Sequence, residues 1–248
     1  MQHLKLLIPT ILLCSILQSQ EIPSDMVLIP SGEFTMGKNS NNPTDWQPEH
    51  KVYIDAFYMD KLEVTNQQYY DFCKASSHPL PEFWGQVQFK CSLEYPDHPV
   101  VFVSCYDAEK YAKWAGKRLP TEAEWEYACR GGLENKNFPW GDQADTTKAN
   151  YAKKYKTTLK VGSFQPNGYG LFDMSGNVWE WTSDFYGHDY YSNSPDQNPR
   201  GPETGRFKVI RGGSWHSGPM CNQTFYRNGL SPSWIDFGVG FRCVKSVK

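Results

Sequence analysis

The chain has 248 residues, of which 25 are lysine or arginine and 27 are aspartate or glutamate, so its formal net charge is −2. This balance gives no basic surface of the kind that binds nucleic acid or an anionic membrane. Aromatic residues make up 15% of the chain, which also contains nine tryptophans, 20 glycines and 17 prolines. Such a composition favours a loop-rich fold held together by large flat side chains over a helical bundle.

The first twenty residues differ from the rest of the chain. Lys5 precedes an apolar run over residues 6–17, and polar residues follow at 18–21. The run has about the length of a signal-peptide core and is too short to span a bilayer. We therefore predict a signal peptide over residues 1–20 and an exported protein, periplasmic, envelope-anchored or secreted, without a transmembrane span.

Two features of this segment bear on lipidation and on the alternative of a buried helix. Cys14 is compatible with a lipoprotein signal, although Leu13 stands where such signals carry a small residue. A buried N-terminal helix is disfavoured by Pro9, which would interrupt its hydrogen bonding. Lipidation at Cys14 therefore stays open.

Three short strands are predicted after this segment. Residues 26–30 and 33–36 alternate between apolar and polar on either side of a Pro-Ser-Gly turn. Val52, Ile54 and Phe57 indicate a third strand. The Asn-, Pro- and Asp-rich stretch before the third strand has no apolar period and is predicted to be a surface loop.

Three helices are predicted from their first residues. Thr65 caps a helix that runs through Ser76. Ser104 and Thr121 are each followed three residues later by an acidic side chain, which is the pattern of a capping box. The second helix is predicted to stop at Gly116 and the third at residues 131–132, which are both glycine. The apolar stripes of the second and third helices are interpreted as core.

Residues 168–184 combine glycines, aromatic residues and two carboxylates. Asp173 and Glu180 stand among apolar residues, where a buried carboxylate needs a partner. With the carbonyls of Gly176 and Val178 they offer four oxygens around one point, and calcium collects about six to eight oxygens with water completing the set. In the alternative, Asp173 bonds its own turn and Glu180 pairs with an arginine.

The last third of the chain is predicted to contain a long loop and two strands. Residues 185–204 are rich in Tyr, Asn, Pro and Asp, which indicates an exposed loop that could line a groove. Residues 207–210 are predicted as a strand and residues 238–244 as the closing strand. Few helices and several short strands together indicate an α+β fold with much irregular structure.

A series of sequence blocks stands in one order over about residues 26–245. The blocks are MVLIPSGEFTMG at 26–37, DKLEVT at 60–65, RLPTEAEWEYA within 99–130, FPWG at 138–141, GNVWEW within 168–184, RGGSW at 211–215 and GFRC at 240–243. In content and order they resemble the formylglycine-generating enzymes, also called the sulfatase-modifying-factor domain. The resemblance implies one domain over residues 22–248 with an architecture related to C-type lectins.

The resemblance also implies metal sites. Family members hold a structural calcium with the residues that match Asp173, Gly176, Val178 and Glu180. They commonly hold a second calcium with residues that match Asn150 and Tyr151 and with a later acidic segment. That segment has no match in this chain, so the second site is expected to be absent or crippled.

The family activity is the oxidation of a cysteine in a sulfatase-type protein substrate to formylglycine, with molecular oxygen and with copper held by two thiolates. By position after Ser214, the first of these thiolates falls on Ser217 and the second near Cys221. A serine hydroxyl is a poor ligand for Cu(I), so copper would need help from Met220 or His216. One of the two copper-binding cysteines is therefore predicted to be missing, which makes copper a doubtful cofactor and catalysis uncertain.

Three further residues are candidates for roles at this site. Ser214 is expected to bond a substrate backbone, with a structural role as the alternative. Trp179 and Arg227 are candidates for substrate binding, and the alternative for Arg227 is to hold the loop. The six histidines show no spacing typical of ligands, which argues against the three-histidine iron branch of the superfamily.

Cys221 has three interpretations: a catalytic or metal-binding thiolate, a disulfide partner, or a free thiol. Without Cys14 six cysteines remain, and an even number in an exported protein is compatible with three disulfides. In some relatives the cysteine that matches Cys129 is bridged to a position shortly after the active-site pair, which makes Cys129 a candidate partner for Cys221.

Three functions follow from these patterns. The first is an exported oxidase of the formylglycine-generating type that acts on a protein or peptide substrate with altered ligands around Cys221. The second is a noncatalytic paralogue that keeps the calcium-stabilised scaffold and its peptide groove. The third is a lectin-like surface binding module, suggested by the Tyr-rich residues 185–192.

Overall fold

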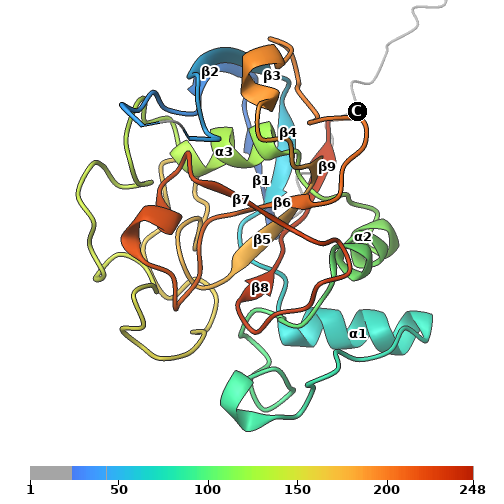
Figure 1. Ribbon diagram of the computed structural model, residues 1–248. Coiled ribbons are helices and arrows are strands. Elements are labelled where there is room, and N and C mark those ends of the chain that lie inside the picture. The colour runs from blue at the N-terminus through green and yellow to red at the C-terminus, as the bar shows by residue number, and fades with distance from the viewer. Residues whose placement is uncertain (1–23, 43, 248) are drawn as a thin grey trace, which may run out of the picture.

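The computed structural model describes residues 24–42 and 44–247 and shows a mixed α/β fold with short elements and long connections (Figure 1). The predicted signal peptide and Cys14 lie outside the described residues. Within them, no helix is long and apolar enough to cross a membrane. The elements in chain order are β1 (Met26–Ile29), β2 (Gly32–Met36), β3 (His50–Ile54), β4 (Phe57–Asp60), α1 (Asn66–Ser76), α2 (Cys105–Trp114), α3 (Glu122–Arg130), β5 (Trp179–Phe185), β6 (Lys208–Arg211), β7 (Arg227–Leu230), β8 (Val239–Gly240) and β9 (Val244–Ser246).

The strands form three small sheets. One has the order β1-β4-β9, the second pairs β2 with β3, and the third has the order β7-β6-β5-β8. Its β5 and β8 run parallel, whereas the other pairs are antiparallel. The helix α3 contacts β2 and β3 on one side and β5 and β6 on the other, while α1 and α2 pack against each other (Figure 1).

The three helices begin where their capping residues predict. Thr65, Ser104 and Thr121 each accept a hydrogen bond from the backbone of the third helical residue, whose side chain bonds back to the cap. These reciprocal bonds satisfy two donors at each helix start. Gly131 closes α3 in the left-handed conformation with φ 58°, as predicted, whereas α2 ends at Trp114, just before the predicted stop.

Two predicted strands are wrong in extent. Ile54 ends β3 and Phe57 begins β4, which pairs in a different sheet. The predicted closing strand over residues 238–244 is split into β8 and the start of β9. Between them, Arg242 is fully buried and donates to Glu180 and to backbone carbonyls. The segment between β8 and β9 therefore places a buried ion pair and does not continue the strand.

The apolar interior has two parts, which α3 and β5 bring together. One cluster surrounds Trp181 and includes the inner faces of α1 and α2, and the other surrounds Trp125 of α3. Both indole rings are fully buried. Trp181 donates from Nε1 to the carbonyl of Val103 at 3.0 Å, and Trp125 donates to Glu180 at 2.8 Å, so both buried N–H groups are satisfied.

Candidate functional site

The buried carboxylate of Glu180 on β5 is paired with an arginine. Its Oε1 accepts from Arg242 Nη2 at 2.7 Å, and its Oε2 accepts from Arg242 Nε and from Trp125 Nε1, both at 2.8 Å. Both oxygens are thus engaged in charge-assisted bonds. This is the pairing that the sequence offered as the alternative to a metal ligand at Glu180.

Asp173 lies near Glu180 and Arg242. Its backbone has the left-handed conformation, with φ 56°. Its Oδ2 accepts from the backbone N–H of Gly162 at 2.6 Å, so it ties the turn to an earlier segment of the chain. Burial raises the pKa of Asp173 to about 6, against the opposing effects of this hydrogen bond and of Arg242.

Glu63, between β4 and α1, is a third carboxylate near Arg242 and is buried, and the sequence analysis did not single it out. It accepts from Asn177 Nδ2 at 2.6 Å and from the backbone N–H of Val178 at 3.2 Å. It therefore holds the turn before β5 in place. Burial raises the pKa of Glu63 well above its usual range, and the two neighbouring carboxylates add to this effect.

The buried carboxylates of Glu63 and Glu180 and the partly buried carboxylate of Asp173 thus surround one guanidinium, that of Arg242. An excess of buried negative charge favours a bound cation or a retained proton. Within the described residues, no group of three or more His, Cys, Asp or Glu side chains is placed to hold a metal ion by itself. The chemistry of the donors fits calcium only if the carbonyls of Gly176 and Val178 and water complete the set.

The residues matching the family's second calcium site lie beside this cluster. Asn150 donates from Nδ2 to the carbonyl of Thr157 at 2.9 Å and to Asn177 Oδ1 at 3.1 Å. Its Oδ1 and the hydroxyl of Tyr151 are buried and have no partner in the described structure. The loss of the second calcium site stays a prediction.

A cluster of two hydroxyls and one imidazole follows β6. Ser214 Oγ lies 2.9 Å from His216 Nδ1 and 3.0 Å from Ser217 Oγ, and Ser217 Oγ accepts from the backbone N–H of Ser214 at 3.1 Å. Burial lowers the pKa of His216, which favours the neutral imidazole at neutral pH. Ser214 is fully buried and Ser217 is 8% exposed, so the two hydroxyls lie in the interior and bond mainly to each other.

Cys221 lies a short distance along the same loop, in a 3₁₀ turn over Pro219–Asn222. Its thiol is partly exposed and lies against the hydroxyl of Tyr226. Burial, together with this thiol, raises the pKa of Tyr226 to about 12. The Tyr226 ring in turn packs 6.0 Å from the ring of Trp179 and 5.3 Å from that of Trp46. Cys221 thus lies against one aromatic side chain, Tyr226, which in turn packs against two others.

All six cysteines of the described residues are free thiols. The predicted bridge between Cys221 and Cys129 is therefore not confirmed. Cys129 is fully buried in the cluster around Trp125 and donates to the carbonyl of Met174 at 3.3 Å, whereas Cys221 packs against the other core cluster. Burial raises the pKa of the Cys129 thiol, so it stays protonated.

Arg227, a predicted substrate-binding residue, is buried at the start of β7. It donates to both oxygens of Glu122 at 2.7 Å and to the carbonyls of Asp45 at 3.1 Å and Gly187 at 2.9 Å. These bonds tie α3, β7 and two loops together. In this arrangement Arg227 holds the loops, which was the alternative for this residue.

The comparisons with known proteins bear on this arrangement. A family profile described as "Sulfatase-modifying factor enzyme 1-like domain" matches residues 16–247. The chain belongs to this family. Glu180 and Trp181 of the GNVWEW block, Arg211 of RGGSW and Arg242 of GFRC are far apart in sequence, and all lie in the interior.

Individual relatives carry different names. The formylglycine-generating enzyme of Streptomyces coelicolor is 35% identical over 89% of each chain, and that of Bos taurus is 36% identical over 89% of this chain and 74% of its own. A relative named serine/threonine-protein kinase pkn1 of Chlamydia pneumoniae is 37% identical over 92% of this chain, but the match spans only 39% of that relative's length. The mouse relative named inactive C-alpha-formylglycine-generating enzyme 2 is 30% identical over 90% of this chain and 86% of its own.

Solved structures support the same fold. PvdO from Pseudomonas aeruginosa matches with a TM-score of 0.78 at 29% identity, over 90% of this chain and 94% of that one. Treponema denticola variable protein 1 matches with a TM-score of 0.75 at 23% identity, over 90% and 95% of the two chains, and shows similarity of fold alone. The predicted fold class is confirmed.

Proposed function

We propose that this chain is a sulfatase-modifying-factor family protein that binds a peptide segment of a partner protein beside Cys221, without two-thiolate copper oxidation. One observation carries the proposal: the loop between β6 and β7 has one thiol, Cys221, while Ser214 and Ser217 bond each other at 3.0 Å. Cu(I) prefers soft thiolate donors, and a hydroxyl is a hard donor. The residues present therefore do not fit the copper pair of the family.

The surroundings of Cys221 support peptide binding. Tyr226 and Trp46 are partly exposed rings that adjoin each other, and the largely buried Trp179 packs against Tyr226. Tyrosine and tryptophan are enriched among the residues that dominate binding energy at interfaces. The partner that we propose is a protein, of the sulfatase type or another. We also propose that this chain is exported.

A second candidate is an oxidase that converts a cysteine of a protein substrate to formylglycine with altered ligands. It is favoured by the relatives named formylglycine-generating enzyme and by the partly exposed thiol of Cys221. Met220, which is 55% exposed, and His216 would then have to replace the second thiolate. The two candidates differ in a product that can be measured.

The deciding experiment incubates copper-loaded protein with a Cys-x-Pro-x-Arg peptide. We expect fluorescence anisotropy to show binding that weakens by about tenfold in Trp46→Ala, since a partly exposed aromatic ring is removed, and mass spectrometry to show no aldehyde. In Ser217→Cys the second thiolate should raise the Cu(I) affinity by about tenfold or more in a competition assay. Aldehyde formed by the unchanged protein and lost in Cys221→Ser would establish the oxidase instead, and a peptide that fails to bind would contradict both.

We also propose that Asp173, Glu180 and the carbonyls of Gly176 and Val178 bind a structural calcium ion. The excess of buried carboxylates over cations around Arg242 supports this. Calcium at about one hundred times its Kd should stabilise the fold by about 2.7 kcal/mol, seen as a higher Tm. Asp173→Ala should abolish this shift, while Asp142→Ala, which changes an exposed carboxylate, should keep it. Native protein whose Tm does not respond to calcium contradicts the assignment.

A further inference from the structure

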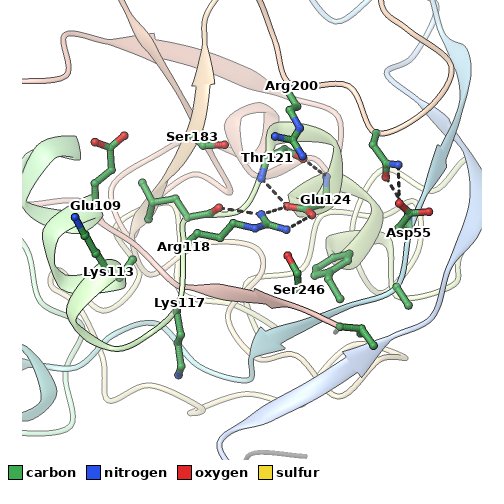
Figure 2. A pocket seen from close by; sticks show the side chains of 16 residues that line it. Asp55, Glu109, Lys113, Lys117, Arg118, Thr121, Glu124, Ser183, Arg200 and Ser246 are labelled. Atoms are coloured by element: carbon green, nitrogen blue, oxygen red, sulfur yellow. Dashed lines mark hydrogen bonds and ion pairs between the residues drawn. The ribbon is translucent and has the colours of Figure 1, made fainter. Parts of the chain in front are cut away.

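A cavity of about 500 Å³ lies apart from the Cys221 loop and shares no lining residue with it. It is bounded by α2, by the turn into α3, by the end of β9 and by the loop after η2, the 3₁₀ turn over Tyr190–Asn193. Figure 2 shows its polar lining, which includes Glu109 and Lys113 of α2, Arg118 and Glu124 around the turn, Arg200 of the loop and Ser246 of β9. Nothing in the proposed function uses this cavity.

One wall of the cavity is an unpaired strand edge. On one side β9 pairs with β4, with Ser246 opposite Phe57. On the other side the backbone of Val244 exchanges hydrogen bonds with that of Arg118 at 2.8 and 2.9 Å. Backbone groups two residues apart in a strand point to the same side, so the N–H and C=O of Ser246 point away from β4, as those of Val244 do. Within the described residues no strand pairs with Ser246 on this side.

The acidic side chains on the cavity wall all have bonding partners, whereas two of the basic side chains have none among the described residues. Each carboxylate has a partner: Glu124 is bound by Arg118 at 2.6 and 2.7 Å, Asp55 accepts from Asn198 at 2.9 Å, and Glu109 lies 3.9 Å from Lys208. Two cations do not.

Lys113 and Arg200 are the unmatched cations. In the part of the chain that the structure describes, neither side chain forms a hydrogen bond or ion pair (Figure 2). The charge that the cavity leaves available is therefore positive. Because Glu124, Asp55 and Glu109 already have partners, an anionic ligand would not need to displace them.

The remaining lining is apolar. Phe57 and Leu119 are buried side chains that reach the cavity, and Ala112 of α2 lies beside them. A ligand that fits must therefore offer backbone donors and acceptors, negative charge and apolar groups. An extended peptide offers all three, because its alternate side chains point to opposite faces.

We propose that this cavity binds an extended acidic peptide segment of a partner protein. Its backbone pairs with the free N–H and C=O of Ser246 on the outer edge of β9, and its carboxylates pair with Lys113 and Arg200. Strand addition of this kind gains affinity from main-chain hydrogen bonds and specificity from side-chain contacts. A small anion would use the two cations but would leave the strand edge unpaired.

Fluorescence anisotropy with a labelled peptide of alternating valine and glutamate tests the proposal. We expect saturable binding that weakens as salt is raised, and no comparable binding of the matching valine and lysine peptide. The double variant Lys113→Glu with Arg200→Glu should lose about tenfold or more in affinity. The double variant Lys74→Glu with Lys148→Glu, which makes the same charge change at exposed residues outside the cavity, should not.

Ser246→Pro tests the strand edge separately. It removes the N–H that points into the cavity and leaves the pairing with β4 in place, since the Ser246 N–H does not bond to β4. Affinity should fall about tenfold, while Ser246→Ala, which keeps the N–H, should bind as the unchanged protein does. Circular dichroism melts confirm that each variant is folded.

Three outcomes would overturn the proposal. The first is the absence of binding at peptide concentrations up to about 1 mM. The second is binding that neither Ser246→Pro nor the charge reversal weakens. The third is a concentration-dependent dimer, seen by sedimentation and lost in Ser246→Pro, which would assign the strand edge to a second copy of the chain.

Discussion

Replacing Arg242 by methionine should lower the free energy of unfolding by about 3–5 kcal/mol, because it leaves buried carboxylates without their cation. Glu180 would lose its bonds to Nε and Nη2, and Glu63 and Asp173 would lose the nearby positive charge. Urea unfolding measures the change. Arg206→Met, at an exposed arginine, is the matched control and should stay within about 0.5 kcal/mol.

The loss of stability in Arg242→Met should be larger at high pH than at low pH. Burial has already raised the pKa of Asp173 to about 6 and that of Glu63 well above its usual range, and removing the arginine raises both further. A carboxyl whose pKa is raised by folding stabilises the fold at low pH and loses this contribution as pH rises through the folded-state pKa. The variant should therefore be closer to the unchanged protein at pH 5 than at pH 8. An equal loss at both values would contradict the shared-charge cluster.

Replacing Glu122 by alanine should lower the free energy of unfolding by a similar amount, about 3–5 kcal/mol, because it leaves a buried arginine without its anion. Glu122 accepts from Arg211 Nη1 at 3.0 Å and from two nitrogens of Arg227 at 2.7 Å, and all three side chains are buried. Arg211 keeps Glu126 as a partner at 2.6 Å, but Arg227 is left with carbonyls alone. The first turn of α3 and the start of β7 would both lose their link.

Urea unfolding of Glu122→Ala, compared with the exposed Glu203→Ala, measures this loss. The double variant Glu122→Ala with Arg227→Met should recover part of it, since removing both partners leaves no unpaired charge between them. If Glu122→Ala is as stable as the control, then the pair does not hold β7 to α3.

The local features of the fold could be predicted from the sequence, because the interactions that set them span few residues. The caps at Thr65, Ser104 and Thr121 bond within three positions of themselves, so the sequence pattern contains the whole interaction. The strand pairings are different. Nothing within residues 50–60 shows that β3 and β4 belong to different sheets, since this depends on partners elsewhere in the chain.

Some residues of the candidate site could likewise be predicted from the sequence, and others could not. The oxygen donors of the turn before β5 and the serine and cysteine residues after β6 stand in short blocks that the sequence shows directly. Glu63 was missed because its partner Asn177 is 114 residues away, and its only local signal is a carboxylate between Leu62 and Val64. A separation of 62 residues likewise explains why Arg242 could not be named in advance as the partner of Glu180.

The pairing of β9 with β4 has a consequence for how the chain folds. Phe57 and Ser246 face each other across one ladder although most of the chain lies between them, and β8 joins β5 in a parallel pair. Neither ladder can be completed until the chain up to these late strands has been synthesised, and contacts between remote segments slow the search for the native state. Partly synthesised chains would therefore expose the edges of β4 and β5. A molecular chaperone that shields these edges would raise the yield of folded protein.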